Sequence, residues 1–379
     1  MNRSRLALML LLGLLAAACH GRPGRVVFGI GMSSNTHDAV TLAATEINAQ
    51  GGVGGVPLEL VGSEEWARQD QFDPVVTLAW ANRFIANKDL LGVIGHSDSA
   101  STLSAAALYN RSGLPHLVTI ATNPAITNIG PWTYRLCLSD AAQGPALAEY
   151  AVNDWKKRRI AIFFVNDDYG RGLAQRFETR AHELGAEIVT SVMHRNALQD
   201  DDKVMIRSAL GRLKAGPPAD LVALFQRVDA AEWTLQAIHD AGLDVDKLGG
   251  DTLAQYRFAA FSPPLTEGVR VSQFFSLDPA NPRAVQFAKA FRAIAGSEPD
   301  YAQAFAYDAV YLLRDAVLRG GYTRAGVRTY LDGLVTKAAT IQGVGGPFTL
   351  GSDHDARRPL YIAEIRNQTF RVLQAVPVR

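Results

Sequence analysis

Cysteine is nearly absent from this 379-residue chain, which holds only Cys19 and Cys137. Cys19 follows an expected export signal, described below, and is expected to carry a lipid, so Cys137 has no partner for an intramolecular disulfide. Cys137 lies in the apolar run Tyr134–Leu138, a setting typical of a thiol packed in the core. A disulfide framework is therefore excluded, and Cys137 is not expected to be reactive.

An excess of charge of either sign is missing as well. Removing Arg3 and Arg5 of the export signal from 38 basic residues leaves 36 against 37 acidic ones, a formal charge of −1. Such a balance gives no support for nucleic-acid binding. Beyond the signal, no apolar run is long enough to cross a bilayer.

Residues that suggest a metal site are few. Asp353-His354-Asp355 is the one stretch that resembles a ligand set, but it lies in an expected polar turn and has no further ligand nearby. We therefore expect a polar turn between strands, with no metal and no cofactor.

The first residues carry the features of an export signal. Two arginines precede the apolar run Leu6–Leu15, which is too short for a spanning helix. Ala16–Ala18 stand directly before Cys19 and resemble the bacterial lipobox, although the first alanine replaces the usual leucine. We expect residues 1–18 to be a signal peptide, and residues 19–25 to be a lipid anchor and tether. Ordinary cleavage near Cys19 is the alternative.

The remaining 361 residues exceed what one hydrophobic core usually holds, so two lobes are expected. In the first part of the chain, short apolar strands alternate with amphipathic helices, which indicates a doubly wound parallel sheet. The expected strands are Arg25–Gly31, Pro57–Gly62, Leu90–Ile94 and Leu117–Ala121.

The same alternation restarts near Asp140 and predicts a second α/β lobe. Its expected strands are Arg159–Val165, Glu187–Val192, Asp220–Phe225, Lys247–Gly250 and Gly268–Phe274. A helical block follows, and then three strands that return near the C-terminus. The chain is thus expected to cross between lobes more than once, which makes a hinge of several strands. We assign residues 26–138 and 277–340 to the N-terminal lobe, and residues 139–276 and 341–379 to the C-terminal lobe.

Polar turns follow two neighbouring strands of the first sheet. Ser97, Asp98 and Ser99 open a helix, whose free N–H groups and dipole favour a carboxylate or phosphate. Thr122 can add a hydroxyl and a backbone N–H from the next turn. Both turns lie at the carboxyl edge of the sheet, where ligands of open α/β folds bind. The alternative is that Asp98 or Ser99 only caps the helix.

One pentapeptide suggests an enzyme. Gly95-His96-Ser97-Asp98-Ser99 lies between a strand and a helix, as the G-x-S-x-G turn of a serine hydrolase does. However, Ser99 replaces the final glycine, and no partner histidine is identifiable from the sequence. A serine hydrolase is therefore a minor alternative.

Several segments in order resemble the type I periplasmic binding proteins of the branched-chain amino-acid (Leu/Ile/Val) family, in lipoprotein form. The resemblance runs from Val26 to the C-terminus. Its segments are Asp38–Gly55, Val93–Thr102, Gly113–Thr127, Tyr134–Gly144, Phe164–Ala174 and Ala306–Leu313. Such proteins are the solute receptors of ABC importers, so the resemblance implies two Rossmann-like lobes and a ligand between them.

The resemblance also implies roles for five residues that follow expected strands. Ser99 matches the serine that hydrogen-bonds the ligand carboxylate, and Thr122 matches the threonine of the same anchor. Ala121 matches the residue whose carbonyl receives the ligand ammonium. Tyr169 matches the second-lobe tyrosine that closes over the ligand, and Asp251 matches the acid that pairs with the ammonium.

Two further residues bear on the ligand side chain. Arg227 stands where receptors of this family tend to carry an aromatic, and a cation there suits an acidic or amide-bearing ligand; a solvated loop arginine is the alternative. Trp66 is a candidate for stacking on the ligand, or an exposed loop residue. The loop Met32–His37 lacks the aromatic that often lines the side-chain pocket, so the side chain recognised stays open.

The resemblance therefore implies a receptor and not an enzyme, exported to the periplasm and anchored there by its lipid. Its expected partners are a small amino-acid or amide-like ligand and the permease subunits of an ABC transporter. A second class stays open: a lipoprotein of the same fold that acts as a sensor or activator of an envelope protein. Permease subunits in a pull-down favour the receptor, whereas a cell-wall enzyme partner without a ligand favours the regulator.

Overall fold

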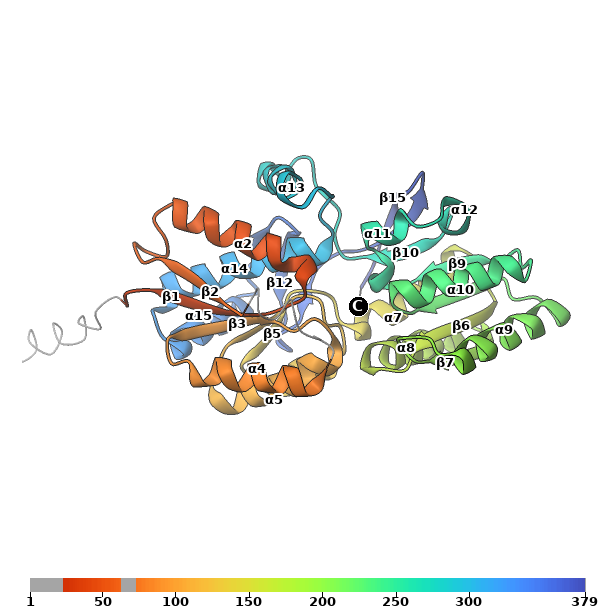
Figure 1. The fold of residues 1–379 in the computed structure, drawn as a ribbon, viewed down its shortest axis with the longest axis horizontal. Helices are drawn as coiled ribbons and strands as arrows, with labels where there is room; N and C mark the ends of the chain where they lie inside the picture. The colour runs from red at the N-terminus through yellow and green to blue at the C-terminus, as the bar shows by residue number, and fades with distance from the viewer. Residues whose placement is uncertain (1–22, 63–72, 379) are drawn as a thin grey trace, which may run out of the picture.

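The computed structural model describes residues 23–62 and 73–378 (Figure 1). The expected signal peptide, the lipidation site Cys19 and the candidate Trp66 lie outside these residues. Within them, no helix is both long enough and apolar enough to span a membrane.

The first lobe is built on a five-stranded sheet with the order β2-β1-β3-β4-β5, in which all neighbours are parallel. The strands are β1 (Val26–Gly31), β2 (Leu58–Val61), β3 (Leu90–Gly95), β4 (His116–Val118) and β5 (Thr133–Arg135). The helices between them are α2 (Ser34–Ala49), α4 (Pro74–Ala86), α5 (Ser99–Ser112) and the short α6 (Ala125–Asn128).

Helices cover both faces of this sheet, which explains why its strands read as continuous apolar runs (Figure 1). All six residues of β1 are buried, and successive side chains point to opposite faces. Phe28 and Ile30 join the core formed with α2 and α14, whereas Val27 packs with residues of α4 and α5.

The second lobe is built on a seven-stranded sheet with the order β15-β14-β10-β9-β8-β6-β7. Its parallel strands are β6 (Arg159–Val165), β7 (Glu187–His194), β8 (Leu221–Phe225), β9 (Asp246–Gly249) and β10 (Arg270–Gln273). β14 (Leu360–Arg366) and β15 (Thr369–Val376) extend the sheet in antiparallel fashion. The helices of this lobe are α7 (Asp140–Glu149), α8 (Asp168–Glu183), α9 (Asp200–Ala215), α10 (Val228–Asp240) and the short α11 (Tyr256–Ala259) and α12 (Pro263–Thr266).

After β10 the chain returns to the first lobe. It forms α13 (Pro282–Ala295), α14 (Tyr301–Gly320) and α15 (Arg324–Thr336), of which α13 and α14 pack on α2. Within the described residues, the chain therefore passes between the lobes after β5, after β10 and before β14. Two α/β lobes joined by a hinge of several segments confirm the expected fold class (Figure 1).

The last crossing differs from the expected boundary at residue 341. The strands β11 (Ile341–Gly343), β12 (Gly346–Leu350) and β13 (Ala356–Arg357) form a separate three-stranded sheet, and β12 packs on α15 of the first lobe. The reason is that Phe348 and Leu350 are buried in the core that also contains residues of α14 and α15. The chain enters the second lobe only at β14.

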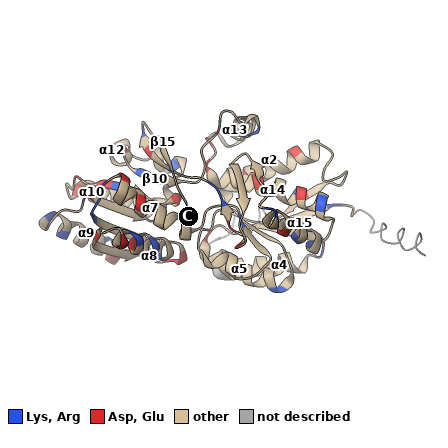
Figure 2. Cartoon of the chain, turned by 180° about the vertical axis from the view of Figure 1, so that it is seen from behind, with Lys and Arg blue, Asp and Glu red and all other residues tan. Residues whose placement is uncertain are grey.

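Acidic and basic residues both occur on the helices of the two lobes, for example on α9 and α15 (Figure 2). This mixture fits the near-neutral charge of the sequence.

Candidate ligand-binding site

A cavity of about 340 Å³ lies between the lobes, at the carboxyl ends of strands from both sheets. Six of the seven expected site residues line it: Ser99, Ala121, Thr122, Tyr169, Arg227 and Asp251. Its volume falls in the range of small-molecule sites, roughly 300–1,000 Å³. A larger hollow of about 460 Å³ lies on the outside of the first lobe, between α2, α13 and α14 and away from the strand ends.

The first-lobe wall of the cavity is the start of α5. Asp98 is the N-cap residue, and its Oδ1 accepts a hydrogen bond from the Ser101 backbone N–H at 3.1 Å. Ser99 follows as the first helical residue, so Asp98 caps the helix and Ser99 does not. The Ser99 Oγ accepts from the Asn123 backbone N–H at 3.3 Å, which leaves the proton of the Ser99 hydroxyl available to a ligand.

The Ala121 carbonyl already has hydrogen-bond donors within the protein. Its oxygen lies 3.3 Å from Nη1 of the buried Arg135 and 3.5 Å from the Cys137 Sγ, and both groups donate to it. A carbonyl oxygen has two lone pairs, and here both face donors of the protein itself. Ala121 lines the cavity, and the expected contact between its carbonyl oxygen and a ligand ammonium stays a prediction.

The second-lobe wall is centred on Asp251, whose side chain is almost fully buried. Its Oδ1 accepts from the Tyr169 hydroxyl at 3.1 Å and from Nε2 of Gln143 at 2.9 Å. Its Oδ2 accepts from the Tyr301 hydroxyl at 3.0 Å, which leaves this oxygen one lone pair for a ligand donor. The carboxylate is thus oriented by three neutral donors.

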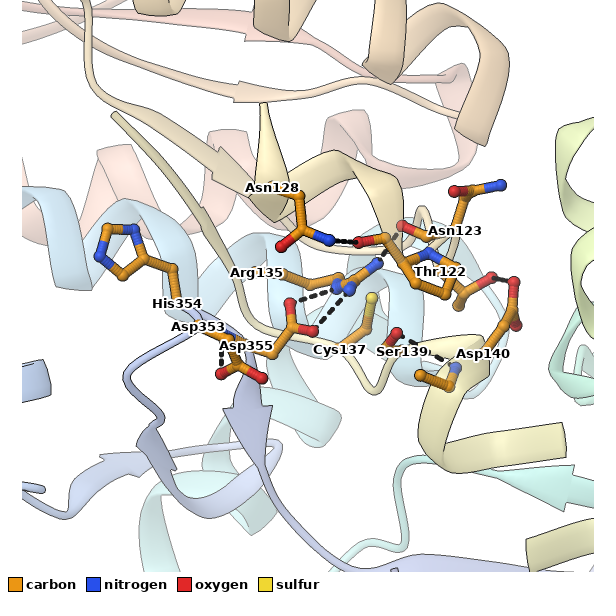
Figure 3. A network of polar contacts seen from close by, with 12 residues as sticks. Thr122, Asn123, Asn128, Arg135, Cys137, Ser139, Asp140, Asp353, His354 and Asp355 are labelled. Atoms are coloured by element: carbon orange, nitrogen blue, oxygen red, sulfur yellow. Dashed lines mark hydrogen bonds and ion pairs between the residues drawn. The ribbon is translucent and has the colours of Figure 1, made fainter. Parts of the chain in front are cut away.

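Three residues of this network were not foreseen from the sequence: Asp140, Gln143 and Tyr301. Gln143 bridges the two acids, because its Nε2 donates to Asp140 Oδ1 at 3.0 Å as well as to Asp251. Asp140 Oδ2 also accepts from the Thr122 hydroxyl at 2.9 Å (Figure 3). Asp140 and Gln143 are three residues apart at the start of a helix and therefore share a face, which was the available signal.

The two buried acids disfavour each other's charge. Burial raises the pKa of Asp140 to about 8, and the nearby charge of Asp251 contributes to this rise. Burial also raises the pKa of Asp251, while hydrogen bonds from Gln143, Tyr301 and Tyr169 act in the opposite direction. At neutral pH we therefore expect Asp140 to hold a proton and Asp251 to be the charged member of the pair.

This arrangement predicts a pH-dependent effect of Asp140→Asn. The pKa of Asp140 is about 8 in the folded protein and about 3.9 in an unfolded chain, so its stabilising contribution is present below pH 4 and lost as the pH rises through 8. We expect Asp140→Asn to gain stability relative to wild type between pH 5 and pH 8, by on the order of 1 kcal/mol per pH unit. Urea unfolding of both proteins without ligand measures this difference; a constant difference would contradict the assignment.

Arg227 is not a solvated loop residue. It is the N-cap residue of α10, and its Nη2 forms an ion pair with Asp167 Oδ2 at 2.8 Å. Its side chain is 21% exposed and lines the cavity.

The Asp353-His354-Asp355 turn lies between β12 and β13, and its side chains contact other parts of the protein. Asp355 forms two hydrogen bonds with Arg135 (Figure 3). Asp353 pairs with Arg357. The His354 ring stacks on Tyr134 with a centroid distance of 4.4 Å. Within the described residues, no group of three or more histidine, cysteine or acidic side chains is arranged to hold a metal ion.

In the described part of the chain, the pentapeptide that resembles a hydrolase turn has no base beside its serine. The buried Ser97 Oγ has no hydrogen-bond partner in the structure. The imidazole of His96 instead lies 2.9 Å from the Tyr109 hydroxyl, through its Nε2. A serine nucleophile activated by a histidine is therefore not present at Ser97.

Comparisons with known proteins agree with this geometry. The family model described as periplasmic binding protein matches residues 29–369. The Leu/Ile/Val-binding protein homolog 1 of Brucella suis biovar 1 is 29% identical over 281 residues, which cover 74% of this chain and 72% of that protein.

Solved structures share the fold over nearly the whole chain. A leucine binding protein from Thermotoga maritima superposes with a TM-score of 0.81 at 21% identity, covering 93% of this chain and 98% of that one. An ABC transporter substrate-binding protein from Desulfitobacterium hafniense was solved in complex with Leu. It superposes with a TM-score of 0.77 at 25% identity, covering 92% of this chain and 100% of that one. These proteins bind solutes and are not enzymes, as expected for this chain. The chain belongs to the type I periplasmic binding proteins of the branched-chain amino-acid family.

Proposed function

We propose that this protein is the extracytoplasmic receptor of an ABC importer and binds a free amino acid or a similarly small polar molecule between its lobes. The observation that carries the proposal is the placement of Asp251. This oriented carboxylate lines the same cavity as the N-terminus of α5, so one space offers an anion for an ammonium group and N–H donors for a carboxylate.

The hydrogen bonds suggest how each end of the ligand is held. The ligand carboxylate accepts from the Ser99 hydroxyl and from backbone N–H groups at the start of α5 and at Thr122. The ammonium donates to Asp251 Oδ2 and to the Thr122 oxygen, whose own proton is directed at Asp140. Thr122 is thereby assigned to both ends, in place of the expected carboxylate anchor alone.

Contacts between the lobes support enclosure of the ligand. The Asn123 Nδ2 donates to the Asp168 backbone carbonyl at 2.8 Å, and the Tyr301 hydroxyl reaches Asp251 from α14 of the other lobe. Tyr169 then covers the cavity from the second lobe. Charge-assisted hydrogen bonds in such a desolvated space contribute about 1.5–3 kcal/mol each.

A thermal-shift screen of the purified protein tests the binding mode. The compounds are the common amino acids, amines without a carboxylate, carboxylates without an amine, urea and short peptides. A ligand that binds only the folded state adds about 2.7 kcal/mol at one hundred times its dissociation constant, so true ligands give a clear shift. If stabilisation comes only from compounds that lack an ammonium group, the amino-acid mode is wrong.

The importer role needs a separate test, because the fold also suits a sensor. Pull-down from membranes is expected to recover ABC permease subunits, and deletion of the gene is expected to abolish uptake of the stabilising ligand. Recovery of a cell-wall enzyme, together with an empty ligand screen, would favour the regulatory role.

The lipid anchor is also part of the proposal and makes a prediction. Cys19→Ala removes the thiol that carries the lipid, so the variant is expected to move from the membrane fraction to the soluble fraction. Cell fractionation measures the shift, with Cys137→Ala as the control that keeps the membrane location. Mass spectrometry that finds an unmodified mature N-terminus would end the lipoprotein proposal.

A further inference from the structure

The part of the cavity beyond the proposed ammonium and carboxylate contacts carries several polar side chains beside apolar ones. Its lining includes Ser97, Asp98, Arg227 and Gln255, while Ile120 and Val228 supply apolar surface. A pocket for an aliphatic side chain is expected to be lined mainly by apolar groups. This wall therefore points to a polar group at the far end of the ligand.

Asp98 has an unused hydrogen-bond acceptor at this wall. Asp98 is only 7% exposed, and its Oδ2 has no hydrogen-bond partner among the described residues, although its Oδ1 caps α5. The neighbouring Ser97 Oγ is also buried without a partner. Buried polar atoms are nearly always hydrogen-bonded in native proteins, so this pair is suited to a donor that arrives with the ligand.

Arg227 supplies hydrogen-bond donors at the same wall of the cavity. Its guanidinium attracts Asp98 electrostatically, but the Asp98 Oδ2 remains without a hydrogen bond, so the two side chains are not in direct contact through this oxygen. The guanidinium is held by its ion pair with Asp167 and carries five N–H donors in a fixed fork. One end of the cavity thus presents an acceptor and a fork of donors together.

Three side-chain classes fit this combination poorly. An aliphatic side chain would leave the Asp98 oxygen buried without a donor when the lobes close. An acidic side chain would be repelled by Asp98, and a basic one by Arg227. The charge of Asp98 therefore excludes the acidic ligands that the cation of Arg227 suggested in the sequence.

We infer that the ligand is an amino acid whose side chain ends in a neutral carboxamide or ureido group. Its N–H donors bind Asp98 and Ser97, and its carbonyl oxygen accepts from Arg227. Asparagine, glutamine and citrulline are ligands of this class. The inference rests on the proposed amino-acid receptor function and specifies its side-chain end.

This inference is tested by measuring the affinity of the full mature protein for isosteric ligands, using isothermal titration calorimetry. Asparagine is compared with aspartate and leucine, and glutamine with glutamate and methionine. We expect each amide to bind about tenfold or more tightly than its acid and about hundredfold more tightly than its apolar isostere, because a site that hydrogen-bonds a polar group rejects analogues that lack it.

The variant Asp98→Asn isolates the charge, since asparagine also caps helices well. We expect about tenfold weaker amide binding and a smaller preference for the amide over the acid. Asp73→Asn is the matched control, because Asp73 is the N-cap residue of α4 and does not line the cavity. It is expected to leave all affinities unchanged.

The outcomes separate this inference from the proposed function. If leucine binds as tightly as asparagine, or Asp98→Asn keeps the full amide preference, the side-chain assignment is overturned while the amino-acid receptor stands. If no compound with both an ammonium and a carboxylate binds, the proposed function fails and the inference falls with it.

Discussion

Asp251→Ala is expected to weaken amino-acid binding about hundredfold, the largest effect on affinity for a single residue of the site. The substitution removes the carboxylate that faces the ligand ammonium and leaves that charge unpaired in a closed cavity. It also removes the acceptor of the Tyr169 and Tyr301 hydroxyls. A charge-assisted hydrogen bond of about 3 kcal/mol corresponds to roughly hundredfold in affinity.

Calorimetric titration with the best ligand of the screen measures the loss. Asp251→Asn is expected to lie between wild type and Asp251→Ala, because the amide keeps an acceptor but not the charge. Asp240→Ala serves as the control, since its side chain is 63% exposed at the end of α10. Thermal unfolding without ligand separates lost binding from lost folding. Wild-type affinity of Asp251→Ala would show that Asp251 is only a turn residue.

Asp355→Ala is expected to destabilise the protein by about 3–5 kcal/mol, the largest effect on folding. Asp355 accepts from Arg135 Nε at 2.8 Å and from Nη2 at 2.7 Å, and the Arg135 side chain is fully buried (Figure 3). Removing the acid leaves the guanidinium buried without its counter-charge. The same arginine donates to the Asn123 carbonyl at 2.7 Å, so the turn that carries Thr122 is expected to loosen and the affinity to fall.

Asp353→Ala is the matched control, two residues away in the same turn. Asp353 pairs with Arg357, and both side chains are about half exposed, so we expect a loss below about 1 kcal/mol. The double variant Arg135→Met/Asp355→Leu is expected to recover much of the stability, because it leaves no buried charge. Urea unfolding measures all three proteins. If Asp355→Ala and Asp353→Ala lose equal free energy of unfolding, the buried ion pair does not stabilise the protein as expected.

The position of the site could be anticipated from the sequence because it depends on strand ends. Ser99 and Thr122 follow strands of the first sheet, whereas Tyr169 and Asp251 follow strands of the second. Parallel strands bring such turns to one edge, and the four residues do line one cavity. The chemical roles of the site residues depend on their hydrogen-bond partners, which the sequence pattern does not reveal. The Ala121 carbonyl is the example, since a buried arginine and a thiol already occupy it.

The sequence by itself determined the two α/β lobes, because apolar runs and helical stripes are local and report burial directly. Runs such as Leu221–Phe225 are indeed completely buried strands. Only the tertiary structure decided which polar groups meet. Arg135 and Asp355 are 220 residues apart, and Gln143 and Asp251 are 108 apart. Neither pair leaves a periodic trace in the sequence, because each contact joins segments that are brought together only by the tertiary fold. The packing of β12 on the first lobe was likewise not readable from the pattern, because it joins segments that are far apart in the sequence.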